Sequence, residues 1–297
     1  PVVLPAPGRH VNLEMKITAP AKGNNLPVLL LSHGHGQSNF LSSSKGYGPL
    51  TDFFASHGFI VIQPTHQNSK ALALDPGLPE APLFWSSRPK DMQHILANLD
   101  KVLAAVPGLE GRADKTRIAA VGHSLGGHTV GMLAGTQETD PATGKIVDAI
   151  EPRIKAFVII GAPGAPSGLS EFAKVHYPVL AGTDFTTMSL PALIVNGDED
   201  KNPNFSDEDN WRADGYYQSK GPKSLLTVYG AEHMFGGISG YDARETTDES
   251  PERVAFVCES ILAYLSTALN PDDASWSKLE EELNDDPAAK GRIDNKQ

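Results

Sequence analysis

The sequence predicts an α/β protein with a mostly parallel central sheet flanked by helices. Short runs of consecutive apolar residues recur along the chain, and such runs are typical of strands covered on both faces. Stretches with the spacing of amphipathic helices lie between them, so strand and helix alternate. The apolar runs cover residues 28–31, 59–62, 118–121, 157–160, 193–195 and 225–228.

The first predicted strand differs from the others. Residues 11–17 alternate between apolar and polar side chains, which is the pattern of a strand with one face in water. We therefore expect an antiparallel strand that starts the sheet. Helical spacing follows over residues 50–56 and 91–106, and again over residues 251–269.

Three long segments interrupt this alternation, namely residues 63–88, 136–153 and 162–190. Loops of such length in a compact domain are commonly functional, so we expect lid-like insertions that wall a substrate pocket. No shift of composition separates two blocks, and residues 1–269 are predicted to form a single domain. Residues 270–297 are mostly charged or small and polar, which predicts a peripheral helix or a partly disordered tail without a chemical role.

Composition excludes several classes of partner and cofactor. The 36 acidic and 25 basic residues give a net charge of -11, so a nucleic acid backbone would be repelled. No apolar run approaches the ~20 residues of a membrane-spanning helix. Cys258 is the single cysteine, which rules out an intrachain disulfide or a thiolate cluster for zinc, and its helical stripe predicts a buried thiol. The start at Pro1 rather than Met fits a processed protein, and a secreted or periplasmic location is favoured over the cytoplasm.

A five-residue motif carries the chemistry of the chain. Residues 122–126 read Gly-His-Ser-Leu-Gly, directly after the apolar run 118–121 and directly before a helical stretch. In this context the pattern predicts a strained turn that presents the serine at the start of a helix, because side chains at the glycine positions would collide with the neighbouring strand or helix. Ser124 is therefore the predicted nucleophile, with helix N–H groups near it for an oxyanion. The alternative is a chance glycine-rich turn.

The chain resembles the α/β-hydrolase superfamily, and within it the bacterial chlorophyllase-like and polyester-hydrolase-like carboxylesterases. The resemblance spans about residues 11–269. It implies the α/β-hydrolase fold and a serine hydrolase that cleaves carboxylic esters without a cofactor. Its motifs are Ser-His-Gly-His-Gly at 32–36, Gly-His-Ser-Leu-Gly-Gly at 122–127, Asn-Gly-Asp-Glu-Asp at 196–200 and Gly-Ala-Glu-His at 230–233.

A serine hydroxyl needs a base, normally a histidine that a carboxylate holds in one tautomer. In this fold the order along the chain is serine, acid, histidine. The resemblance places the base at His233, in the loop after the last predicted strand, with His176 inside an insertion as the rival. Similar hydrolases have the acid three residues after a glycine, which selects Asp200, while Asp198 on the same loop stays open.

The tetrahedral intermediate requires two N–H donors. One follows the nucleophile and is the backbone of Leu125, and the resemblance assigns the other to the backbone of His35, after the run 28–31. The His33 imidazole is expected to brace this loop by hydrogen bonding to backbone, and the His35 side chain to edge the pocket.

Two metal hypotheses compete with this interpretation. His33 and His35 have the His-x-His spacing of metal ligands, but no third ligand accompanies them. Residues 198–209 carry acidic and amide side chains that could hold calcium, but Pro203 stands where an EF-hand needs its glycine and Asp209 replaces the closing glutamate. We therefore expect no metal site.

The predicted reaction is hydrolysis of a small-molecule or polymeric ester through an acyl-enzyme on Ser124. Phe84, Trp85, Met234 and Phe235 are candidates for an apolar pocket, although these side chains equally fit packing of the lids onto the sheet. An amidase, a peptidase or an acyltransferase would use the same triad. A non-catalytic binding protein on the same fold is the alternative of a different class.

Overall fold

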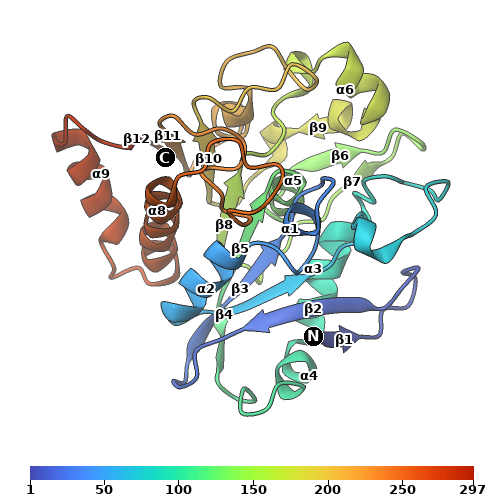
Figure 1. The fold of residues 1–297 in the computed structure, drawn as a ribbon, viewed down its shortest axis with the longest axis horizontal. Coiled ribbons are helices and arrows are strands. Elements are labelled where there is room, and N and C mark those ends of the chain that lie inside the picture. Colours follow the sequence, from blue (N-terminus) through green and yellow to red (C-terminus); the bar gives the residue numbers. More distant parts are fainter.

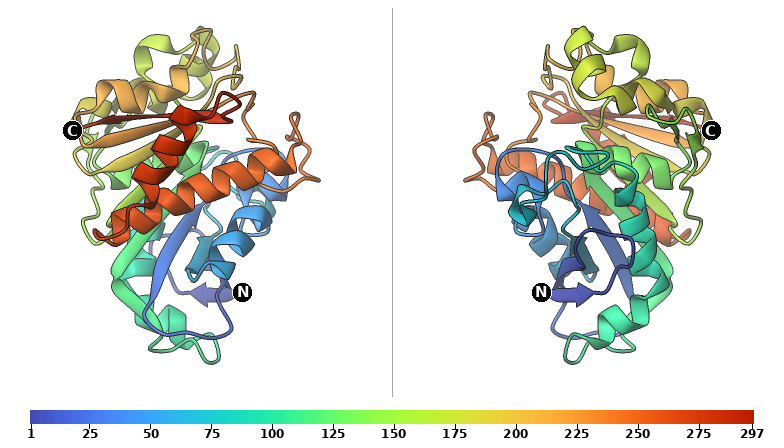
Figure 2. Two further views of the ribbon diagram at one scale, coloured as in Figure 1. Left: turned by 90° about the vertical axis from the view of Figure 1, so that its left-hand side faces the viewer. Right: turned by 90° about the vertical axis from the view of Figure 1, so that its right-hand side faces the viewer.

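A computed structural model describes residues 1–297 and has the predicted α/β architecture. A nine-stranded sheet runs through the molecule, and helices cover both of its faces (Figure 1, Figure 2). Its strands are β1 Val2–Leu4, β2 Leu13–Thr18, β3 Leu26–Ser32, β4 Ile60–Pro64, β5 Ala113–His123, β8 Ala156–Ile160, β10 Ala192–Gly197, β11 Lys223–Val228 and β12 Gly291–Lys296. Their order across the sheet is β1-β2-β4-β3-β5-β8-β10-β11-β12.

The six central strands, β4 to β11 in this order, are mutually parallel. They contain the six apolar runs except Phe59, which lies just before β4, so the prediction of a mostly parallel sheet is confirmed. The reversed strands lie toward the edges, because β2 is antiparallel to β4 and β12 is antiparallel to β11. The predicted antiparallel starter strand is β2, and the short strand β1 pairs with it at the edge of the sheet.

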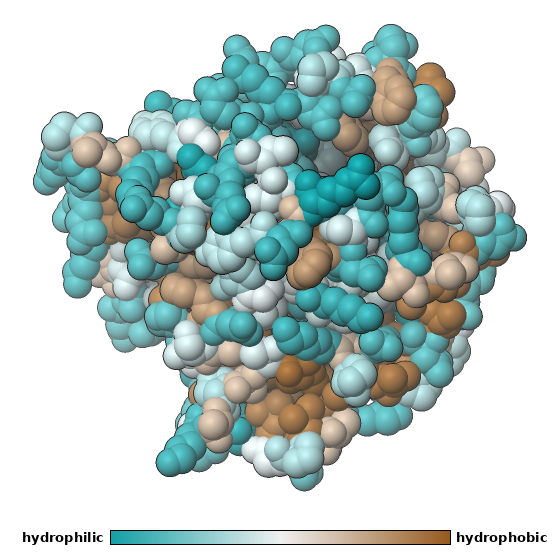
Figure 3. Space-filling model, in the orientation of Figure 1, coloured by the Kyte–Doolittle hydropathy of each residue, from teal (hydrophilic) through white to brown (hydrophobic).

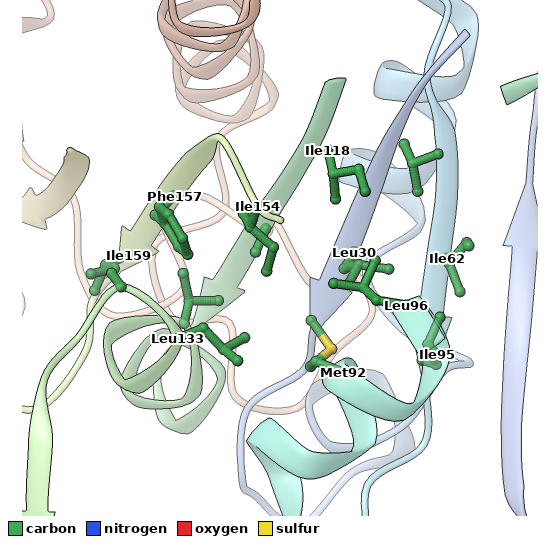
Figure 4. Packing of buried hydrophobic residues seen from close by; sticks show 14 of the residues in the cluster. Leu30, Ile62, Met92, Ile95, Leu96, Ile118, Leu133, Ile154, Phe157 and Ile159 are labelled. Atoms are coloured by element: carbon green, nitrogen blue, oxygen red, sulfur yellow. The ribbon is translucent and has the colours of Figure 1, made fainter. Parts of the chain in front are cut away.

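Helices form a layer on each face of the sheet. One layer contains α2 Gly48–Ser56, α8 Pro251–Leu269 and α9 Ser275–Asp285, and the other contains α3 Ser87–Ala97, α4 Leu99–Ala104 and α5 Leu125–Leu133. Alternate side chains of β3 face the two layers: Leu30 packs in the core under α3, whereas Leu31 packs in the core under α2 and α8. Figure 4 shows Met92 and Ile95 of α3 close to Leu30 and Ile62 of the sheet.

The predicted helix over residues 91–106 is two helices in the structure. Asn98 separates α3 from α4, with φ −119° and ψ 22°. Its side-chain amide donates to the carbonyl of His94 at 2.9 Å, which also accepts the Asn98 backbone N–H at 3.2 Å. An asparagine that competes for backbone groups in this way ends a helix that its apolar spacing alone would continue.

The insertions contain short elements of their own. The strands β6 Gln137–Thr139, β7 Ile146–Val147 and β9 Thr183–Asp184 form a small antiparallel sheet in the order β7-β6-β9. Because β6 pairs with β9, backbone hydrogen bonds join the second insertion to the third. The remaining helices are α1 Asn39–Ser42, α6 Glu171–His176 and α7 Asp214–Gln218, with short 3-10 turns at Lys70–Leu72, Pro166–Gly168, Pro178–Gly182, Phe185–Thr187 and Trp211–Ala213.

Residues 270–297 hold more structure than the predicted tail. The helix α9 agrees with the expected peripheral helix, and its Trp276 ring packs edge-on against Tyr264 of α8. The strand β12 was not predicted. It buries Ile293, and Asn295 accepts a hydrogen bond from the Trp276 indole. An edge strand with a single buried apolar residue gives almost no periodic signal, so the sequence pattern misses it.

The face shown in Figure 3 is mostly hydrophilic, in keeping with the net charge of −11. On the face shown in Figure 3, apolar atoms gather mainly in a patch toward the lower end of the molecule. No helix combines the length and the apolar character that crossing a membrane requires.

Candidate active site

The candidate active site lies beyond the carboxyl ends of the central strands. After β3 the chain adds β4 on one side of it and later returns to place β5 on the other side. Ligand sites of open α/β sheets form at such a switch in strand order. The loops after β3, β5, β10 and β11 carry the residues 33–36, Ser124, Asp200 and His233, and the structure brings all four together.

Ser124 occupies a strained turn between β5 and α5. Its backbone angles, φ 56° and ψ −121°, are rarely adopted by residues other than glycine. A Cβ on Gly122 would lie 2.1 Å from the carbonyl oxygen of Gly126, and a Cβ on Gly126 would lie 2.0 Å from that of Ser32. The Ser124 N–H donates to the carbonyl of Ile160 at 2.8 Å, which anchors the turn to the neighbouring strand. The glycines of the motif are therefore required by close packing.

Ser124, His233 and Asp200 form one continuous chain of hydrogen bonds. The Ser124 Oγ lies 3.0 Å from His233 Nε2, and His233 Nδ1 lies 2.8 Å from Asp200 Oδ2. The carboxylate assigns the imidazole proton to Nδ1, which leaves Nε2 as an acceptor for the serine hydroxyl. The Asp200 side chain is almost completely buried, whereas His233 is 30% exposed. This arrangement can take the proton of Ser124.

The two rival residues lie elsewhere. Asp198 Oδ1 accepts the backbone N–H of Gly230 at 2.6 Å and does not contact His233. His176 is exposed on α6, where its Nδ1 hydrogen bonds to the carbonyl of Phe172 at 2.9 Å. The structure brings neither of them to Ser124.

Arg212 contacts the acid and was missed by the sequence analysis. Its Nε forms an ion pair with Asp200 Oδ1 at 2.9 Å, and its Nη1 donates to the carbonyl of Gly161 at 2.9 Å. Burial opposes ionisation of Asp200, but Arg212 and His233 outweigh it and hold the pKa of this carboxyl well below its usual range. Arg212 belongs to no motif, so its contact with Asp200 becomes evident only from the folded loop after β10.

His123, the residue before Ser124, links the base to the loop after β3. Its Nε2 lies 2.8 Å from the carbonyl of His233, so Nε2 carries the proton and donates it. Its Nδ1 then accepts the hydroxyl of Tyr47 at 2.9 Å, and Tyr47 accepts the N–H of Gly34 at 3.0 Å. Burial lowers the pKa of His123 to about 3, so the ring stays neutral. No motif in the sequence indicates this connection either.

The loop after β3 lies against the nucleophile. A Cβ on Gly34 would come within 3.3 Å of the Ser124 Cβ. The His33 ring braces the loop as expected, because Nδ1 donates to the carbonyl of Gly34 at 2.8 Å and Nε2 accepts the N–H of His66 at 2.9 Å. His35 lines the cavity at Ser124.

A cavity of about 170 Å³ opens at Ser124. Leu125 lines it at the start of α5, opposite apolar side chains that come from the insertions. The rings of Tyr177 and Phe205, which line the same cavity, stack with their centroids 5.3 Å apart. The lining residues are His35, Leu83, Ser124, Leu125, Pro163, Tyr177, Leu180, Asn202, Phe205, Arg212 and His233.

The four predicted pocket residues do not line this cavity. Trp85 packs in the apolar cluster behind it, and Met234 and Phe235 are buried in the core beneath the His233 loop. Phe84 lines a separate surface cavity beside His10. The alternative interpretation, packing of the loops onto the sheet, describes Trp85, Met234 and Phe235.

The residues of the two metal hypotheses are engaged with protein groups. Asp209 forms an ion pair with Lys201 at 3.2 Å, and Asp200 is held by Arg212 and His233. The His35 Nδ1 contacts the side-chain amide of Asn68 at 3.2 Å. No group of three or more His, Cys, Asp or Glu side chains is placed to hold a metal ion.

Comparison with known proteins assigns the family. The chain has the fold of an esterase from Pyrobaculum calidifontis, with a TM-score of 0.58 at 17% sequence identity over 92% of this chain and 85% of that chain. A search of curated protein sequences finds no significant match. The sequence model of the chlorophyllase family matches residues 8–195, which is more than half of the chain. The protein is thus an ester hydrolase of the α/β-hydrolase fold, and it belongs to the chlorophyllase family.

Proposed function

We propose that the protein is a serine carboxylesterase that works through an acyl-enzyme on Ser124. The observation that carries this proposal is the unbroken chain from Ser124 Oγ through His233 to Asp200, with contacts of 3.0 and 2.8 Å. The three residues come from loops after three different strands, and two of them, Ser124 and His233, line the same cavity.

In the proposed cycle, Ser124 Oγ attacks the ester carbonyl carbon while His233 Nε2 removes the hydroxyl proton. Collapse of the tetrahedral intermediate breaks the bond to the alcohol, which leaves with the proton from His233. Water then attacks the acyl-enzyme, with His233 again acting as base, and the acid and free Ser124 are released. Asp200 stabilises the imidazolium throughout, and its pairing with Arg212 keeps it ionised.

The backbone N–H groups of Leu125 and His35 are the proposed oxyanion donors. Leu125 is the first residue of α5, where an N–H has no acceptor within the helix and the helix dipole favours negative charge. His35 follows Gly34, which packs against Ser124. Two fixed donors aimed at the developing charge account for a large share of catalysis in enzymes of this type.

The substrate is proposed to carry a compact apolar group next to the ester. The cavity of about 170 Å³ is small, and its lining includes Leu83, Leu180, Tyr177 and Phe205. The small volume and the apolar part of this lining favour short aliphatic or single-ring groups over long chains.

The test is hydrolysis of p-nitrophenyl esters from acetate to decanoate by the native protein and by Ser124→Ala. We expect turnover that peaks at short chains and is lost in the variant. The matching p-nitroanilides test the amidase alternative, and added alcohols as acyl acceptors test the transferase alternative. Absence of ester turnover together with absence of labelling of Ser124 by a fluorophosphonate would contradict the proposal.

A further inference from the structure

A fully buried arginine lies behind the loop that carries the proposed oxyanion donor. Arg88 is the second residue of α3, and none of its surface is exposed. Its guanidinium forms no direct ion pair and donates only to neutral oxygens. These are Thr129 Oγ1 at 2.8 Å, Ser32 Oγ at 3.2 Å, the carbonyl of His33 and the side-chain oxygen of Asn68. Burying a cation in this way is costly, so four directed contacts indicate a specific structural task.

Arg88 fixes the orientation of the Asn68 amide. An arginine has donors and no acceptor, so the oxygen of Asn68 must face it and the NH₂ group must face the other way. That NH₂ group lies 3.3 Å from the carbonyl of Gly34 and 3.2 Å from Nδ1 of His35. If the amide turned over, its oxygen would oppose the Gly34 carbonyl and the unprotonated nitrogen of His35.

The position of the Gly34 carbonyl determines the direction of the next N–H. The peptide between Gly34 and His35 is planar and trans, so its N–H points opposite to its C=O. The carbonyl is held by Asn68 and by the Nδ1 of His33, neither of which lines the cavity that His35 and Ser124 line. The His35 N–H is thereby directed toward the side where Ser124 and the reacting carbonyl lie.

We propose that Arg88, acting through Asn68, is a positioning residue that sets the oxyanion-binding orientation of the peptide between Gly34 and His35. Neither Arg88 nor Asn68 lines the cavity, so neither can touch the substrate. This inference rests on the proposed function, because it requires an oxyanion at Ser124. Arg88 and Asn68 thereby influence the rate of reaction through the direction of the His35 N–H, in addition to their part in packing.

The experiment compares Asn68→Ala and Arg88→Lys with the native protein. Asn68→Ala removes one of the two donors to the Gly34 carbonyl, and Arg88→Lys keeps the charge but loses the planar fork that serves several acceptors at once. We expect kcat to fall about 10- to 100-fold in each variant, somewhat less than the loss of a whole oxyanion donor, with KM changed by less than about twofold. If Arg88→Lys does not fold, Asn68→Ala alone decides.

The decisive measurement is the affinity for two matched ketone inhibitors, of which only one forms an oxyanion when it binds. Ser124 Oγ adds to the carbonyl carbon of a trifluoromethyl ketone, and the carbonyl oxygen becomes an oxyanion. The matching methyl ketone binds mainly without this addition, as an analogue of the ground state. We expect the variants to lose about 10-fold or more in affinity for the first and to keep their affinity for the second. A defect that only lowers the amount of folded enzyme leaves this ratio unchanged.

Arg112→Lys is the matched control. Arg112 also donates to neutral carbonyls, those of Pro20, Gly23 and Gly108, none of which lines the cavity. It should keep native kcat and the native inhibitor ratio. Unchanged kcat and ratio in folded Asn68→Ala, beside an active native enzyme, would overturn the positioning role alone. Absence of activity in the native protein, with no labelling of Ser124, would instead overturn the proposed function.

Discussion

The protein contains two Ser-His-Asp chains of hydrogen bonds with nearly the same geometry. In one, the serine-to-histidine and histidine-to-aspartate contacts are 3.0 and 2.8 Å, and in the other they are 2.9 and 2.8 Å. We call the first the cavity triad and the second the buried triad. They are Ser124–His233–Asp200 and Ser32–His66–Asp91, respectively.

The surroundings of the two serines are very different. Ser32 is fully buried on a regular strand, and its Oγ also accepts a hydrogen bond from Arg88. Ser124 stands on a strained turn at the start of a helix and faces a cavity. Proton-transfer geometry alone therefore does not distinguish a nucleophile. Access, a backbone turn that presents the hydroxyl and nearby donors for the oxyanion are the features that separate the two sites.

The largest expected effect is the contrast between the two serines. Ser124→Ala should lower kcat by about 10⁶-fold, as is typical when a nucleophile is removed, and should abolish labelling by a fluorophosphonate. Ser32→Ala should still be labelled, at Ser124, because the probe cannot reach a fully buried hydroxyl. Peptide mapping by mass spectrometry locates the label, and a label on Ser32 would refute the comparison.

The two aspartates should differ in the property that they affect. Asp200→Asn should lower kcat by about 10⁴-fold with little loss of fold, because the imidazole loses its fixed tautomer. Asp91→Asn should instead lower the free energy of unfolding by about 3–5 kcal/mol, because it leaves its ion-pair partner Arg9 buried without a counter-charge. Kinetics and urea denaturation of both variants give the measurement. Asp198→Asn is the control and should keep native kcat.

A smaller effect is expected from the chain that braces the cavity triad. Tyr47→Phe removes the hydroxyl that joins Gly34 to His123, and His123→Phe removes the donor to the His233 carbonyl. Each leaves a buried polar group without a partner, a cost of about 1–3 kcal/mol, so we expect kcat to fall about 10-fold. A double variant that is no worse than either single one would show that the two act together. Native kcat in both would contradict a bracing role.

The pH dependence of stability is a gradual effect to which each buried histidine contributes a part. Burial lowers the pKa of His35 to about 4 and of His123 to about 3, and it holds those of His33 and His66 well below the usual value. The unfolded chain therefore binds protons below about pH 6.5 that the folded protein does not, so the free energy of unfolding falls as the pH falls. Burial raises the pKa of Asp91 to about 7, which acts in the opposite direction and offsets the share of one histidine.

Urea denaturation at about pH 7.5 and about pH 5 measures this effect. Each histidine contributes up to about 1.4 kcal/mol per pH unit over its range. His123→Phe should reduce the change in the free energy of unfolding between the two pH values by the contribution of one histidine. A free energy of unfolding that stays constant or rises toward pH 5 would contradict the assignment of neutral buried histidines.

Much of the fold is encoded locally and could be predicted. The six apolar runs became the six parallel strands, and α8 has the predicted bounds of residues 251–269. Ser124 could be predicted because a strained turn requires glycine at fixed positions, and these glycines are recognisable in the sequence. His233 and Asp200 follow strands whose apolar runs are plain, so their placement at one edge of the sheet followed from topology and resemblance.

The walls of the cavity could not be predicted because they depend on how long loops fold. Leu83 lines the cavity while its neighbour Phe84, with a φ of 49°, lies at a different one. Neither apolar periodicity nor a motif specifies such a reversal of direction. Arg212 was missed for the same reason, since its role exists only once the loop after β10 returns to Asp200.

The small sheet β7-β6-β9 has a consequence for how such proteins diversify. Leu180 and Tyr177 of the cavity wall lie just before β9, which is held by β6 rather than by the central sheet. This part of the wall thus stands on a scaffold separate from the strands that hold Ser124, Asp200 and His233. We expect substitutions and length changes in residues 136–153 and 162–190, which lie outside β8, to alter which acyl groups fit without disturbing the reacting groups, so that substrate choice and chemistry can evolve independently.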